Sequence, residues 1–192
     1  MDAGTAEARL LDAAGALFNA RGVQAVGMDA IRTASGVSLK RLYQLFPSKD
    51  DLVSAVLTSR SQAVAEGIAA HARPDATPSE RILDVFDYLE EWFTTPDFRG
   101  CALINSYGEL GGVSHAVATI VRSHTQALTA HFATLVAAAG GPPPLADQLA
   151  LLANGAMATA GILGTPEPAR QARTAAEALM AAAPTQAPRA AT

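Results

Sequence analysis

The sequence predicts an all-α protein of about nine helices, because three features of the chain agree. Apolar residues recur every three or four positions along almost the whole length, and no stretch alternates apolar and polar residues as a surface strand does. Clusters of glycine and proline interrupt this helical periodicity at intervals. Of the 192 residues, 49% are hydrophobic, which suits one to two compact domains with a sizeable core.

The first two helices are predicted from their caps and their apolar faces. A helix from Glu7 to Arg21 is expected, with Thr5 as its N-cap and Gly22 placed to end it. A second helix is expected over 28–34. The residues expected to face inward are Leu10, Ala14, Leu17 and Phe18 on the first helix, and Ala30, Ile31 and Ala34 on the second.

A tight turn at residues 35–37, with Gly36 at its centre, joins the second helix to a third. Ser38 is the expected cap of this helix, which covers Leu39–Leu45, and Pro47 stops it. Two short helices around a glycine turn form the unit whose second helix can enter the DNA major groove. Because such short helices are not stable alone, the neighbouring helices are expected to hold them through Leu17, Phe18, Ile31, Val37, Leu42, Phe46 and Leu52.

The outer face of the third helix carries side chains that suit DNA. Arginine can bind a guanine edge with two hydrogen bonds, glutamine can bind an adenine edge, and leucine can touch a thymine methyl group. A lysine near the start of the next helix suits a phosphate. The candidate DNA contacts are Ser38, Leu39, Lys40, Arg41, Tyr43, Gln44 and Lys49. For Tyr43, a place in the core with its hydroxyl at the rim is the alternative interpretation.

Six further helices are expected, each starting or ending at a break in the sequence. The fourth opens with a capping-box pattern at Ser48 and Asp51 and continues toward His71. The fifth starts at Pro78, with Thr77 and Glu80 as its capping box, and Pro96 closes it. The other four are expected over about 100–109, from the cap Ser114 to the break at 140–144, over 145–163, and from just after Thr165-Pro166 to near Ala183.

These elements predict a DNA-binding head at 1–47, a ligand-binding and dimerisation body at 48–183 with the fourth helix as connector, and a disordered Pro/Ala-rich tail at 184–192. The formal charge of −4 divides unevenly, with a net +1 in residues 1–60 and a net −5 in the rest. A positive N-terminal part and a negative remainder suit a DNA-facing head on an acidic body, although so modest a charge asymmetry can also arise by chance.

Composition argues against several other classes of protein. The single cysteine, Cys101, leaves no internal disulfide framework and no cysteine-based zinc site, and it favours the reducing cytoplasm. His124 and His131 lack convincing metal-ligand spacing, so neither a metal nor a cofactor is expected. No catalytic motif stands out, which argues against an enzyme, although catalytic groups can be distant in sequence. Residues 145–164 are the one candidate membrane span, and their Ala, Gly and polar content favours a buried helix instead.

The segment from Leu10 to Val56, and above all GVSLKRLYQLFPSKDDLVSAV from Gly36, resembles the signature of the TetR-type one-component transcriptional regulators. The resemblance rests on the turn at 36–38, the aromatic pair Tyr43 and Phe46, and Ser48-Lys49 followed by acids and a leucine. A weaker pattern in the body comprises Arg99, Gly100, Cys101, Asn105 and Glu109. The sequence departs from the family at Gly27, where a Ser or Thr cap is frequent, at Gln44, where His is common, and at Lys40-Arg41, where a small pair is frequent.

The resemblance implies a homodimer that binds double-stranded operator DNA and a body with a small-molecule pocket. It also implies loss of DNA affinity when an effector binds, and usually repression of a nearby gene. The candidate dimer seam lies on the last two helices and comprises Leu145, Leu149, Leu152, Ala156, Ala160, Leu163, Ala169, Ala172, Ala176 and Leu179. An alanine-rich core within one chain is the alternative.

A mostly apolar pocket with few polar anchors is expected in the body. Its candidate lining residues are Phe86, Leu89, Trp92, Phe93, Cys101, Asn105, His124, Leu128 and Met157, together with Tyr107. Each of them can equally be a core residue, and a satisfied core histidine is the commoner interpretation of His124. A redox role for Cys101 has little support, because Arg99 is its one obvious basic neighbour and no resolving cysteine exists. The rival functions are an architectural or activating DNA-binding protein without an effector, and a helical enzyme.

Overall fold

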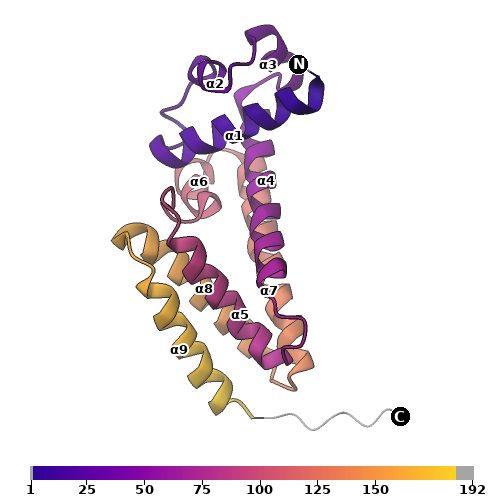
Figure 1. Cartoon of the computed structure of the whole chain (residues 1–192), viewed down its shortest axis with the longest axis vertical. Coiled ribbons are helices and arrows are strands. Elements are labelled where there is room, and N and C mark those ends of the chain that lie inside the picture. The colour runs from indigo at the N-terminus through magenta and orange to yellow at the C-terminus, as the bar shows by residue number, and fades with distance from the viewer. Residues whose placement is uncertain (1, 185–192) are drawn as a thin grey trace, which may run out of the picture. The chain divides into compact units, whose positions relative to one another are not determined.

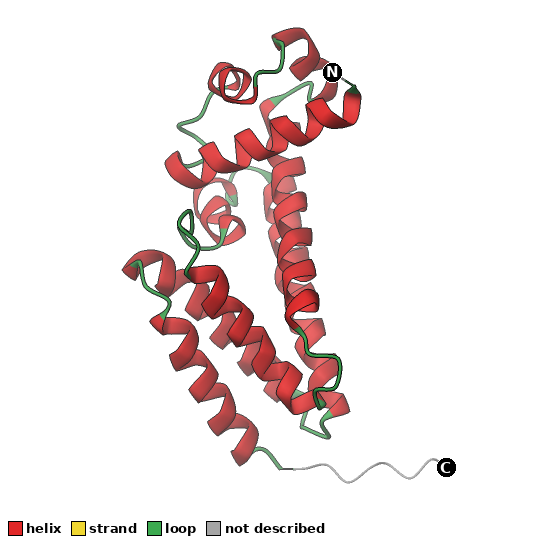
Figure 2. Cartoon of the chain, viewed as in Figure 1, coloured by secondary structure: helices red, strands yellow, loops and turns green. Residues whose placement is uncertain are grey.

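The computed structural model describes residues 2–184 and confirms the all-α prediction, with nine helices and no strand in that range (Figure 2). The helices are α1 Ala3–Arg21, α2 Met28–Ser35, α3 Leu39–Leu45, α4 Lys49–His71, α5 Pro78–Phe93, α6 Ala102–Leu110, α7 His115–Ala138, α8 Pro144–Leu163 and α9 Glu167–Ala182 (Figure 1). The predicted tail lies outside the described residues, except for Pro184.

The helices fall into two compact units. The first contains the chain up to Ala63 together with Cys101–Arg122, and the second contains Val64–Gly100 and the chain from Ser123 onward. Two helices, α4 and α7, run without interruption from one unit into the other. The head helices α1–α3 therefore share their unit with α6 and with parts of α4 and α7.

The start of α1 differs from the sequence prediction, whereas its end agrees. Asp2, rather than Thr5, is the N-cap, and its carboxylate accepts a hydrogen bond from the Thr5 backbone N–H at 2.9 Å. The Thr5 hydroxyl also donates to this carboxylate, at 2.6 Å, so Thr5 belongs to the first turn. At the other end, Gly22 adopts a φ of 81° and its N–H donates to the Phe18 carbonyl at 2.9 Å. A positive φ favours glycine, which explains why the helix ends there.

The core of the head forms as predicted, with one change at the end of α2. Six of the seven residues expected to hold the short helices are buried, and Leu17 is half-buried. The predicted inward position of Ala34 is wrong, because Ala34 is exposed and Ser35 is buried instead. The Ser35 hydroxyl can occupy this site since it donates to the Arg32 carbonyl and accepts from the Val37 N–H.

Both capping boxes are present, while two other boundaries are corrected. The predicted reciprocal bonds form at the start of α4, between Ser48 and Asp51, and at the start of α5. Helix α5 ends at Phe93, before Pro96, because the Thr94 and Thr95 hydroxyls bind carbonyls of its last turn. Helix α6 starts two residues later than expected, at Ala102.

The second unit is built on α5, α8 and α9, which pack against one another. Its core contains large side chains such as Phe86, Leu89 and Leu149, whereas α9 contributes mainly alanines. Gly161 of α8 and Gly100 allow their backbones to approach closely, since a Cβ added at Gly161 would lie 2.7 Å from the Cα of Gly100. Among the described residues, no helix is long and apolar enough to span a membrane.

Candidate nucleic-acid interface

The turn between α2 and α3 has the geometry of a helix-turn-helix unit. Gly36 adopts the left-handed conformation, with a φ of 66° and a ψ of 16°, and its N–H closes α2 on the Arg32 carbonyl at 3.1 Å. Two residues later, the Ser38 hydroxyl accepts a hydrogen bond from the Arg41 N–H at 3.3 Å and caps α3. The chain therefore stops one helix and starts the next within three residues, Gly36 to Ser38.

Helix α3 has one anchored face and one exposed face. Leu42 is completely buried and fixes the helix against the core of the head. On the other side, Leu39 and Tyr43 are 45% and 47% exposed, although large hydrophobic side chains of this kind are usually covered. Lys40 and Gln44 are also exposed. The structure thus places these four predicted contact residues on the surface of α3.

Arg41 and Gln44 lie one turn apart on α3 and form a pair. Arg41 is half-buried, and its Nη1 donates to the Gln44 side-chain oxygen at 3.3 Å. This bond orients the two side chains toward each other. It uses one of the five N–H donors of the guanidinium, so the others remain for the edge of a guanine.

Lys49, the first residue of α4, has a protein partner that the sequence did not reveal. Its ammonium donates to the backbone carbonyl of Val23 at 2.7 Å, and the side chain is half-buried. An ammonium has three donors, so the predicted phosphate contact can form beside this bond. The Ser48 and Asp51 amides are occupied by their capping box, so Lys49 is the main candidate for a phosphate at this helix end.

Comparison with known proteins agrees with this geometry. The bacterial regulatory proteins of the tetR family match residues 10–56, which run from the middle of α1 to the first turns of α4. A tetR transcriptional regulator of known structure from Streptomyces avermitilis is 35% identical, and the alignment covers 90% of this chain and 98% of that one, with a TM-score of 0.73. The chain belongs to the TetR family of transcriptional regulators. It is therefore a DNA-binding, helix-turn-helix protein.

Other relatives support the same family. The structure of a TetR-family transcriptional regulator from Streptomyces coelicolor has a TM-score of 0.85 and 28% identity, with 93% of this chain and 95% of that chain covered. Two uncharacterized HTH-type transcriptional regulators of Mycobacterium tuberculosis are 28% identical in an alignment of 132 residues, and the match covers 62% of this chain. The match spans 61% of the length of these mycobacterial relatives.

In this TetR-family chain, most candidate effector residues lie in the second unit and are buried. Phe86, Leu89, Phe93, His124, Leu128 and Met157 are at most 8% exposed, and Trp92 is half-buried. Burial lowers the pKa of His124, which keeps its imidazole neutral near pH 7. Trp92 contacts Phe93, and Phe93 also contacts Phe98, with their ring centroids 4.6 Å apart. Phe98 is not among the residues predicted from the sequence, because it lies in the loop after α5, where no helical pattern marks it.

The other candidates, Cys101, Asn105 and Tyr107, lie in the first unit, at the start and in the middle of α6. Cys101 is 1% exposed, and burial raises the pKa of its thiol, which disfavours the reactive thiolate. Asn105 is exposed at the rim of a small hollow of about 20 Å³ between α1, α4 and α6. Tyr107 is 44% exposed.

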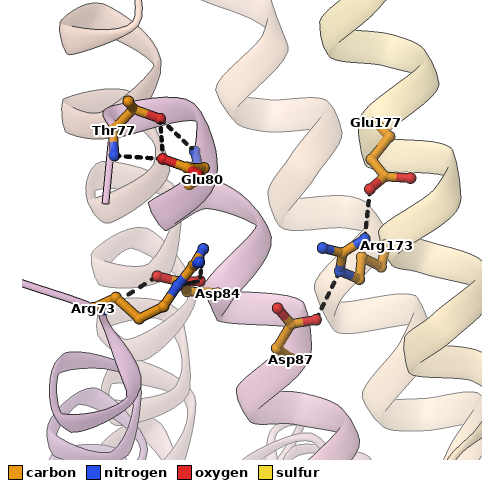
Figure 3. A network of polar contacts seen from close by, with 7 residues as sticks. All are labelled: Arg73, Thr77, Glu80, Asp84, Asp87, Arg173 and Glu177. Atoms are coloured by element: carbon orange, nitrogen blue, oxygen red, sulfur yellow. Dashed lines mark hydrogen bonds and ion pairs between the residues drawn. The ribbon is translucent and has the colours of Figure 1, made fainter. Parts of the chain in front are cut away.

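A network of ion pairs supports the second unit (Figure 3). Arg73 donates to Asp84, whose side chain is almost fully buried, through both its guanidinium and its backbone N–H. Burial of the Asp84 carboxyl acts to raise its pKa, but the bonds from Arg73 outweigh this effect and the pKa is lowered. On the neighbouring face of α5, Asp87 binds Arg173 of α9, which also pairs with Glu177 (Figure 3).

The candidate dimer residues divide between the core and the surface. Leu145, Leu149, Ala156, Ala160, Ala169, Ala172 and Ala176 are buried within the chain. Leu152 and Leu179 are half-buried, and Leu163 is 63% exposed. The surface of α8 instead presents Leu151 and Ile162, which are 73% and 83% exposed. Most of the predicted seam therefore serves the core of the second unit, and the apolar surface lies at neighbouring positions of α8.

Proposed function

We propose that this TetR-family regulator acts in the cytoplasm as a repressor. In this proposal it binds a palindromic operator as a homodimer and is released by a small apolar effector. The observation that carries the proposal is the exposed face of α3, where Leu39, Lys40, Tyr43 and Gln44 stand outside while Leu42 fixes the helix. A short helix that exposes two large apolar side chains between cationic and amide groups is suited to the chemistry of the major groove.

The residues of this face take different roles in the proposal. Arg41, Lys40 and Gln44 contact base edges, and the Arg41–Gln44 hydrogen bond holds two of them in a defined geometry. Tyr43 and Lys49 contact phosphates, which fixes the register of α3 but carries no sequence information. Leu39 is placed to meet a thymine methyl group, and Ser38 supports the start of the helix.

The proposed dimer face lies on α8 and α9. An open groove of about 540 Å³ lies on the surface of this helix pair, and its lining includes Leu151, Leu152, Gly155, Pro168 and Leu179. Glycine and alanine among its lining residues permit close approach of a second helix pair. A second copy of this chain is the fitting occupant, because a two-fold dimer presents two copies of α3 to a palindromic site and doubles the base contacts.

The proposed effector site lies in the second unit, among the buried residues of α5, α7 and α8. Phe86, Leu89, His124 and Met157 offer an apolar lining with one neutral imidazole as a polar anchor. Helix α4 supports coupling, since it is one helix from Lys49, in the unit of the head, to His71 in the other unit. A ligand that prefers the DNA-incompetent state must bind less tightly to the operator complex, with a coupling of about 1–3 kcal/mol.

The proposal is tested by selecting DNA from a random pool with the purified protein and then screening small apolar molecules for release. We expect an inverted repeat to be enriched, with two chains bound per site, and at least one compound to lower the affinity. Replacement of Met157 by Trp fills the proposed site, so Met157→Trp should change both the affinity for that compound and the response of operator binding to it. Unchanged behaviour removes Met157 from the site. If an operator is enriched but no compound lowers the affinity for it, the result favours an architectural or activating DNA-binding protein without an effector.

A further inference from the structure

The turn between α1 and α2 is held by side chains from two other helices of the first unit. The backbone N–H groups of Val23 and Gln24 both donate to the carboxylate of Glu109 on α6, each at 3.0 Å. The Val23 carbonyl accepts a hydrogen bond from Lys49 of α4 at 2.7 Å. The peptide that joins Val23 to Gln24 is therefore bound at its oxygen by a cation and at its N–H by an anion.

Other features of the turn fit this arrangement. The Gln24 side chain donates to the Glu109 backbone carbonyl at 3.0 Å, so the contact between turn and α6 is reciprocal. Gly22 leaves the space that the carboxylate needs, because an added Cβ there would lie 3.0 Å from a Glu109 oxygen. Val23 itself is 2% exposed. We call Glu109, Lys49 and the Val23–Gln24 peptide the turn clamp.

Glu109 lies where an acidic residue does not favour the helix that carries it. Glu109 lies in the last turn of α6, which ends at Leu110. A negative charge at the C-terminal end of a helix is unfavourable for the helix dipole. The carboxylate is compensated there by the two N–H groups of the turn, and hydrogen bonds to a charged acceptor are about twice as strong as neutral ones.

The turn sets the direction in which the chain leaves α1 and enters α2. Helix α2 is joined to α3 by the tight Gly36 turn, so a change at Val23 reorients the whole helix-turn-helix unit. A contact site must be held within about 0.5 Å of its productive geometry. We propose that Glu109 is a positioning residue for DNA binding, which acts through the turn clamp and does not itself touch DNA. This inference rests on the proposed function, since it assumes that α3 reads an operator.

The test compares Glu109→Gln, which keeps the size of the side chain, with Glu66→Gln, which removes the same charge from an exposed position on α4. Loss of an acid by itself strengthens DNA binding, because it weakens repulsion of the phosphates. The proposal predicts the opposite for Glu109→Gln. Affinity for the selected operator should fall by about tenfold relative to the Glu66→Gln control, as expected when one charge-assisted hydrogen bond is lost.

Two further measurements separate positioning from general stability. Hydrogen exchange of the Val23 and Gln24 amides should accelerate in Glu109→Gln and remain at the wild-type rate in the control. The slope of log affinity against log salt should not change, because no phosphate contact is removed. Glu109→Asp, which keeps the charge, should recover part of the lost affinity and part of the amide protection.

Unchanged exchange at both amides would overturn the clamp. Faster exchange with wild-type operator affinity would overturn the positioning role, as would an affinity loss accompanied by a shallower salt slope. If the wild-type protein selects no DNA at all, the proposed function fails and the positioning role fails with it. The exchange rates of the two amides then still show whether Glu109 holds the turn, so the two failures are distinguishable.

Discussion

The exposed face of α3 and the buried faces of α5, α7 and α8 differ in how clearly they indicate function. On α3, folding depends on Leu42 and the Ser38 cap, so the chemistry of Leu39, Lys40 and Tyr43 is not needed for the core. In the second unit, Phe86 and Met157 are needed for the core whether or not a ligand binds. A function can therefore be inferred from side chains that folding does not require, and substitutions in the two regions should differ in their effects.

The largest effect is expected at the surface of α8, where the apolar side chains are also not needed for the core. Leu151→Glu places a charge on a side chain that is 73% exposed, so the chain should fold normally but fail to associate. Sedimentation should show monomers, and operator affinity should fall by about a hundredfold, because a monomer has one head and makes half of the contacts of a dimer. Ala65→Glu, at an exposed position of α4, is the control and should remain dimeric. A dimeric Leu151→Glu protein would move the interface elsewhere.

A loss of stability without direct loss of DNA contacts is expected at Asp84. Asp84→Asn removes the charge that binds Arg73 and should lower the free energy of unfolding by about 1–3 kcal/mol near pH 7. The pKa of Asp84 is lowered in the folded state, so its stabilisation is present above the unfolded pKa of about 4 and is lost as pH falls through the lower folded value. Chemical unfolding at several pH values should show the two proteins converging in strongly acidic solution. A constant difference over this range would contradict the role of the Asp84 charge.

The contrast between base and backbone contacts on the head can be sharpened with Lys40 and Lys49. Lys40→Ala should relax the preference at one base position, since the proposal places it at a base edge. Lys49→Met should weaken binding to all sequences alike, lower the salt slope by about one unit, and also disturb the turn clamp. Titrations of operator and random DNA at several salt concentrations check both. Equal loss of sequence preference in the two variants would contradict the assignment.

The smallest effect is expected at the cap of α5, in the second unit. Thr77→Ala removes the hydroxyl that accepts the Glu80 N–H, and the free energy of unfolding should fall by about 1 kcal/mol (Figure 3). Operator affinity should stay at the wild-type value, because the cap touches neither α3 nor the proposed dimer face. Thermal unfolding and a single DNA titration are sufficient to check this. A changed operator affinity would show that α5 is coupled to the head.

Local signals explain how much could be predicted from the sequence. The boundaries of α3, the Ser38 cap and the box at Ser48 and Asp51 depend on neighbouring residues, and they agree with the structure. The turn clamp was missed because Val23 and Glu109 are separated by 86 positions, and no local pattern indicates that an acid binds two distant amides. The N-cap of α1 was misplaced because Asp2 and Thr5 are both good caps and bind each other.

The surface of α8 shows a different limit of sequence reasoning. Leu149 and Leu151 are both leucines on one apolar helix, and the sequence alone does not tell which of them is buried. Helical periodicity gives the width of an apolar face, whereas the packing of the other helices decides which part of it remains exposed. The same ambiguity applies to the effector candidates, since burial is required of a core residue and of a pocket residue alike.

The central claim, that the exposed face of α3 reads DNA sequence, is tested most directly by comparing wild type and Arg41→Ala on a complete set of single-base variants of the selected operator. Beside its 3.3 Å bond to Gln44, the Arg41 guanidinium keeps donors for the edge of one guanine, so its contact should be specific to one position in each half-site. We predict that wild type discriminates at that position by about 1–3 kcal/mol and that Arg41→Ala binds all four bases there equally. An unchanged preference at every position, with or without a general loss of affinity, would contradict the claim.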